Sequence, residues 1–123
     1  MNGEIKSFKD LIVWQKATDF AITVYKLSSN FPKEELYGLT SQLRRAVISI
    51  SSNIAEGFKR KTRKEKIQFY SIALGSLAEV ESQLSISERL GYIKQDIYED
   101  ALNTISELEK MLGKFTMSAK DKE

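Results

Sequence analysis

The chain has 123 residues, a formal net charge of +2, one proline, and neither cysteine nor histidine. Its length suits a single domain, residues 1–123, with a hydrophobic core of its own. The composition excludes disulfides and thiolate metal sites, and it removes the commonest general base and metal ligand.

The first predicted element is a helix at about residues 8–29. Ser7 can cap its start with a hydroxyl, and Asp10 follows three residues later, where a carboxylate suits the positive end of a helix. Apolar residues then recur at helical spacing over the next four turns. Pro32 ends the pattern, because the residue before a proline disfavours helical geometry.

A second helix is predicted at about residues 33–60. Pro32 suits its start, because proline has no backbone N–H that would need an acceptor in the first turn. Gly57 lies near the apolar face, where a missing side chain lets a neighbouring helix approach closely. Lysines and an arginine follow directly, and cations stabilise the negative end of a helix.

The third and fourth helices are predicted at about residues 63–90 and 95–117. Thr62, with a glutamate three residues later, forms a capping box for the third helix. Gly91 stops that helix because glycine readily adopts the left-handed conformation. The polar residues 118–123 are expected to fray.

These elements predict an all-α fold, an antiparallel up-down-up-down four-helix bundle, because short connections force neighbouring helices to be antiparallel. No sustained alternation of apolar and polar residues favours strands. The longest uncharged run, residues 67–78, is too short to cross a bilayer, and the N-terminus lacks the apolar core of a signal peptide. We therefore expect a cytoplasmic protein with no membrane partner.

The second helix also has a polar ridge beside its apolar stripe. Its members follow one another at helical spacing and offer amides, a hydroxyl, an arginine and a carboxylate: Gln42, Arg45, Ser49, Asn53 and Glu56. One interpretation is an interlocked hydrogen-bond network within or between subunits. The other is a solvated helix flank.

The third helix places two glutamates in unusual positions. Glu81 lies on the core stripe, where a carboxylate needs a partner such as Arg44 or Arg45 unless it lies at the margin and reaches solvent. Glu79 lies on the opposite side, which also presents apolar residues. That side includes Ile72, Gly75 and Ile86, and the second helix similarly presents Ile48 and Ala55. Burial on two faces would require a second subunit, although single exposed apolar residues are also common.

Positive charge is concentrated between the second and third helices. Residues 59–66 contain six cations in eight positions. The net charge is +6 over residues 1–78 and −4 over residues 79–123. Such a turn can bind phosphates, although a solvated turn explains it equally well. The predicted nucleic-acid-binding residues are Arg44, Arg45, Lys59, Arg60, Lys61, Arg63 and Lys64.

No glycine-rich phosphate loop, acidic dyad or nucleophile–base set is present, so we expect no catalytic residue, no metal site and no cofactor. An enzyme that uses Glu56, Glu79 or Glu81 is the least favoured class, because no second chemical group accompanies them.

Several segments, in order, resemble one protein family. They are Phe8–Ala17, then Phe31–Glu35, then Gln42–Ala46 followed by Ser49, Ile50 and Asn53–Gly57, and finally Ala73–Leu77 with Glu79 and Glu81, within a similarity that extends over about residues 7–115. The chain resembles the four-helix bundle proteins called 23S rRNA intervening-sequence proteins, or the S23-type family. It is also similar to the accessory variability determinants of diversity-generating retroelements.

The resemblance implies a small bacterial bundle that assembles into a homopentameric ring. Some members of the family are encoded inside intervening sequences of ribosomal RNA genes, and the accessory determinants bind nucleic acid and a reverse transcriptase. We therefore expect a non-enzymatic, oligomeric protein associated with nucleic acid, most directly RNA. The alternative is a homo-oligomeric scaffold for a protein partner with no nucleic-acid role.

Overall fold

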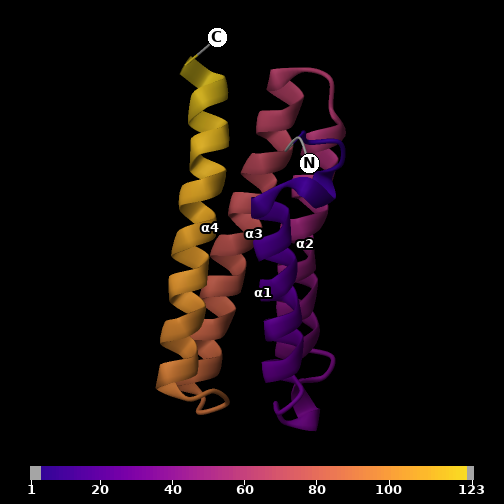
Figure 1. The fold of residues 1–123 in the computed structure, drawn as a ribbon. Coiled ribbons are helices and arrows are strands. Elements are labelled where there is room, and N and C mark those ends of the chain that lie inside the picture. The colour runs from indigo at the N-terminus through magenta and orange to yellow at the C-terminus, as the bar shows by residue number, and fades with distance from the viewer. Residues whose placement is uncertain (1–3, 122–123) are drawn as a thin grey trace.

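The computed structural model describes residues 4–121, with side chains through Thr116. Within these residues there are four α-helices, two short 3₁₀ turns and no strand. The elements are η1 (Phe8–Asp10), α1 (Ile12–Ser28), η2 (Lys33–Glu35), α2 (Leu39–Lys59), α3 (Arg63–Arg89) and α4 (Gln95–Asp121). Consecutive helices are antiparallel, so α1 and α3 run in one direction and α2 and α4 in the other (Figure 1).

The apolar stripes of all four helices meet in one core. The side chains without solvent exposure come from each helix and include Val24, Leu43, Ile50, Leu77, Leu84, Leu108 and Leu112. Helices α2 and α3 pack most extensively against each other. This central pair therefore fixes the position of the connection between them.

The predicted first helix is wrong at its start, because the chain turns before α1 begins. The capping box forms, with Lys9 N donating to Ser7 Oγ at 3.1 Å and Ser7 N donating to Asp10 Oδ2 at 3.1 Å, but it caps η1. Leu11 has an extended backbone (φ −74°, ψ 126°) and ends this turn. The break lets the Phe8 ring pack edge-on against Trp14, with 5.2 Å between ring centroids.

The predicted second helix is likewise divided. After η2 the chain turns at residues 36–38, and α2 begins only at Leu39. Glu35 accounts for the break, because its Oε1 accepts a 3.4 Å hydrogen bond from Leu39 N and its Oε2 accepts a 2.8 Å bond from the Tyr92 hydroxyl. This bond raises the pKa of Tyr92, since the carboxylate stabilises the protonated phenol.

The predicted boundaries of the third helix agree closely with α3. Glu65 N donates to Thr62 Oγ1 at 3.2 Å, and Gly91 has a φ of +82°. Tyr92 N and Gly91 N donate to the carbonyls of Ser87 and Glu88, the pattern that closes a helix around a left-handed glycine. Helix α4 continues to Asp121, past its predicted end, and the rest of the predicted frayed tail lies outside the described residues.

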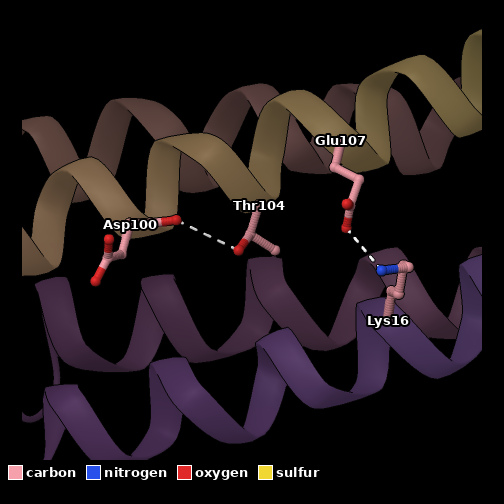
Figure 2. A network of polar contacts seen from close by, with 4 residues as sticks. All are labelled: Lys16, Asp100, Thr104 and Glu107. Atoms are coloured by element: carbon pink, nitrogen blue, oxygen red, sulfur yellow. Dashed lines mark hydrogen bonds and ion pairs between the residues drawn. The ribbon is translucent and has the colours of Figure 1, made fainter.

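Helices α1 and α4 pack least closely of the neighbouring helix pairs. A groove of about 450 Å³ separates them, and Phe20, Leu27 and Ala101 contribute to its walls. Figure 2 shows the ion pair that crosses it, Lys16 Nζ to Glu107 Oε1 at 3.0 Å. Both partners are roughly half exposed, so the pair contributes less than about 1 kcal/mol. Apolar burial must therefore hold the two helices together.

Candidate nucleic-acid interface

The candidate interface is the end of the bundle where α2 leads into α3. Arg60 leaves the helix with an extended backbone (φ −74°, ψ 151°), and Thr62 begins the next helix. Next to this connection, Gly57 lets α2 and α3 approach closely. A Cβ atom at this glycine would lie 2.6 Å from Tyr70 Cε1.

Two cations of the turn form contacts within the subunit that stabilise the fold. Lys66 Nζ donates to the carbonyls of Phe58 and Gly57 at 2.8 and 3.2 Å, which satisfies the last turn of α2. Arg60 forms an ion pair with Glu56, and its guanidinium carbon lies 4.7 Å from the centroid of the Phe69 ring. These contacts support the turn and leave Lys66 and Arg60 less available to a ligand.

Three cations remain free of such contacts. Lys61, Arg63 and Lys64 are exposed, and no hydrogen bond or ion pair of their side chains occurs within residues 4–121. Arg63 and Lys64 occupy the first turn of α3, where the helix dipole disfavours cations by about 0.3–1 kcal/mol each. An anion bound at this turn would relieve that repulsion and meet unpaired backbone amides.

The structure adds two lysines that sequence reasoning missed. η1 packs against α2, and Lys59 Nζ lies 5.8 Å from the centroid of the Phe8 ring. This packing places η1, with exposed Lys6 and Lys9, at the same end as the α2–α3 connection (Figure 1). The sequence signal was the apolar Phe8 beside a capping box, but its packing partner lies about 50 residues away.

Arg44 and Arg45 were grouped with the basic turn, but the structure separates them from it. Arg45 precedes Lys59 by four helical turns, roughly 20 Å along α2. Arg44 faces α1, where its Nε donates to Ser28 Oγ at 2.9 Å and its Nη2 donates to the Tyr25 carbonyl at 3.1 Å. Arg45 is exposed, with no polar contact of its side chain in the described part of the chain.

The polar ridge is only partly connected within one subunit. Asn53 Nδ2 donates to Ser49 Oγ at 3.0 Å, and Ser76 of α3 donates to the same oxygen at 2.8 Å. Glu56 instead pairs with Arg60. Gln42 and Arg45 are exposed and join neither cluster, so an interlocked ridge would require a second subunit.

The two glutamates of α3 also differ from each other. Glu81 is half buried, and the expected ion pair with Arg44 or Arg45 does not form within residues 4–121. The reason is that Arg44 is held by α1, and Arg45 points to solvent. Glu79 is exposed, on the same side as Ile72 and Ile86, which are 51% and 48% exposed.

No three acidic side chains gather as a metal-binding group among the described residues. No helix in the same part of the chain is long and apolar enough to cross a membrane. The fold, together with the cationic end where α2 leads into α3, defines a class of protein: an antiparallel four-helix bundle with one basic end. The chain belongs to the 23S rRNA-intervening sequence protein family, whose sequence profile matches residues 9–114.

One solved structure supports the same assignment. It is a protein with unknown function from the S23 ribosomal protein family of Bacteroides thetaiotaomicron VPI-5482. It is 28% identical to this chain, covers 86% of this chain and 96% of its own, and superposes with a TM-score of 0.80. No curated protein matches the chain. The profile match thus establishes the family, and the solved structure shares the fold.

Proposed function

We propose that the protein is a non-enzymatic, oligomeric, cytoplasmic protein that associates with RNA through the basic end of the bundle. The observation that supports this function is the position of Lys61, Arg63 and Lys64, three exposed and unpaired cations around the N-terminus of α3. The name of the family, which refers to intervening sequences of 23S rRNA, favours RNA over DNA as the ligand.

Oligomerisation is part of the proposal because two faces of the bundle present apolar side chains. A groove of about 440 Å³ between α1 and α2 is lined by Ala21, Ile22 and Ile48. On α3, Ile72 and Ile86 are about half exposed. A ring of subunits, a pentamer by family resemblance, would bury these faces and repeat each weak phosphate site, which increases the overall affinity.

Replacing Lys61, Arg63 and Lys64 together by glutamine tests the phosphate site. We expect the affinity for structured RNA to fall by about 100-fold at low salt, since three phosphate contacts are lost. The slope of the logarithm of the binding constant against the logarithm of the salt concentration should become shallower by about two. Fluorescence anisotropy with labelled structured RNA, duplex DNA and single-stranded RNA, at low and physiological salt, measures both quantities and ranks the ligands.

The matched control replaces Lys33, Arg89 and Lys94, three exposed cations outside the basic end. It lowers the net charge from +2 to −1, as the test variant does (2 − 3 = −1). Only the test variant should lose affinity. Equal losses in both variants would show that net charge alone attracts the RNA and would remove the α2–α3 turn from the proposal.

Replacing Ile48 by aspartate tests the assembly. Ile48 is 44% exposed in one subunit, so the change should leave the helical circular dichroism intact. In an assembly that buries the α1–α2 groove, the unpaired carboxylate would release subunits. We expect light scattering to report a lower mass for Ile48→Asp and an unchanged mass for Ile12→Asp, which is 61% exposed outside this groove. A monomeric wild type would contradict the oligomeric part of the function.

A homo-oligomeric scaffold without an RNA ligand is the second candidate, favoured by the same apolar groove. A pull-down after nuclease treatment separates the two functions. A stoichiometric protein partner that survives nuclease, together with no RNA binding at low salt, would favour the scaffold.

A further inference from the structure

The segment between η2 and α2 presents apolar side chains to solvent. Tyr37 is 94% exposed and Leu36 is 48% exposed, although both lie in an ordered turn. Neither belongs to the core or to the basic end, which lies at the other end of α2 (Figure 1). Tyrosine rings contribute strongly to binding where they become buried, so a fully exposed ring in a folded turn points to a binding surface.

A groove of about 410 Å³ next to this turn has an unbalanced positive charge. Its walls are Tyr25, Leu36, Tyr37, Thr40, Ser41, Arg44 and Arg45, with no acidic residue among them. Neither arginine forms an ion pair within the described residues. The polar contacts of Arg44 are all with neutral acceptors, namely Ser28 Oγ, Ser29 Oγ and the Tyr25 carbonyl. Arg45 is therefore free to bind a carboxylate, and Arg44 adds a positive charge that no ion pair balances within the described residues.

The carboxylate of Glu35 forms no ion pair with either arginine within the described residues. One of its oxygens accepts the Tyr92 hydroxyl at 2.8 Å and the other accepts Leu39 N at 3.4 Å. The pKa of Tyr92 is raised by this bond, which agrees with a carboxylate that is engaged by the phenol.

A second groove, of about 420 Å³, lies on the other side of a row formed by Tyr37, Ser41 and Arg45. Its walls include Gln42, Ser49, Glu79 and Gln83. Glu79 makes this second groove unsuitable for an acidic ligand, so the charge complementarity is confined to the first groove.

We propose that the row Tyr37–Ser41–Arg45, with the adjoining groove that Leu36 and Arg44 also line, is a docking surface for an acidic segment of a partner protein. A carboxylate of the segment pairs with Arg45, and an apolar or aromatic side chain covers Tyr37 and Leu36. This surface is separate from the basic end, so the protein can hold a polypeptide and a nucleic acid at once.

The test is a selection of displayed random 12-residue peptides on the full chain, followed by anisotropy titration of the enriched peptides. Enriched sequences should combine Asp or Glu with Leu or an aromatic residue. Tyr37→Ser and Arg45→Gln should each weaken their binding by about tenfold or more. Leu90→Ser and Lys94→Gln, which change exposed residues outside both grooves, should leave it unchanged.

Both test residues are exposed, so the variants should melt as the wild type does. Several outcomes would overturn the proposal. They are an absence of enrichment, enrichment of basic peptides, and enriched peptides that bind Tyr37→Ser and Arg45→Gln normally. A loss of single-stranded RNA binding in Tyr37→Ser would assign the surface to nucleic acid. A lower mass in that variant would assign it to a second copy of the chain.

Discussion

Gly57→Ala is expected to destabilise the protein, although alanine is the better helix former. The new Cβ would lie 2.6 and 2.9 Å from two ring atoms of Tyr70 and 3.2 Å from Phe69 Cβ. The Tyr70 ring is buried and packs on Phe115, with 5.5 Å between ring centroids, so it cannot move aside freely. Overpacking costs about 1–3 kcal/mol of stability, and the higher helix propensity of alanine recovers up to about 1 kcal/mol. The free energy of unfolding, measured in urea, should therefore fall by about 1–2 kcal/mol.

Gly75→Ala on α3 is the matched control. A Cβ at this exposed position meets nothing within 4 Å, so only the helix propensity changes. Its free energy of unfolding should rise by up to about 1 kcal/mol. If the two variants shifted stability in the same direction, the close approach of α2 and α3 at Gly57 would not exist in solution.

Arg44→Ala is expected to have an effect of similar size, because Arg44 joins α2 to the last turn of α1. Its guanidinium donates to two hydroxyl oxygens and one carbonyl, and it lies 4.7 Å from the centroid of the Tyr25 ring. Removing it leaves the buried Ser28 hydroxyl without this donor. Because hydrogen bonds from a charged group are lost, we expect the free energy of unfolding, measured in urea, to fall by about 1.5–3 kcal/mol.

Arg45→Ala is the control for Arg44→Ala, at the neighbouring position. Its side chain is exposed and free of polar contacts within residues 4–121. The free energy of unfolding of the subunit should therefore change by no more than about 0.5 kcal/mol. Arg44→Lys should recover only part of the loss, because an ammonium group cannot reproduce the planar donor arrangement. Equal stability of Arg44→Ala and Arg45→Ala would contradict the assigned geometry.

The candidate site was only partly predictable for a physical reason. The charges at residues 59–64 are visible in the sequence, but their partners are set by packing. Arg60 and Arg63 look equivalent in the sequence, yet Arg60 pairs with Glu56 four residues earlier and its guanidinium lies over the Phe69 ring of α3, whereas Arg63 has neither contact within the described residues. Lys6 and Lys9 join this end only because η1 folds back onto α2.

The sequence by itself determined the four helical segments, their antiparallel order and the caps at Thr62 and Gly91, because these depend on local spacing and local backbone preference. Only the tertiary structure decided the breaks at Leu11 and residues 36–38. There, contacts of Phe8 with Trp14 and of Glu35 with Tyr92 replace the helical continuation that the local pattern favoured. It also decided which cations stabilise the fold and which remain free, since that division depends on residues brought together from different helices.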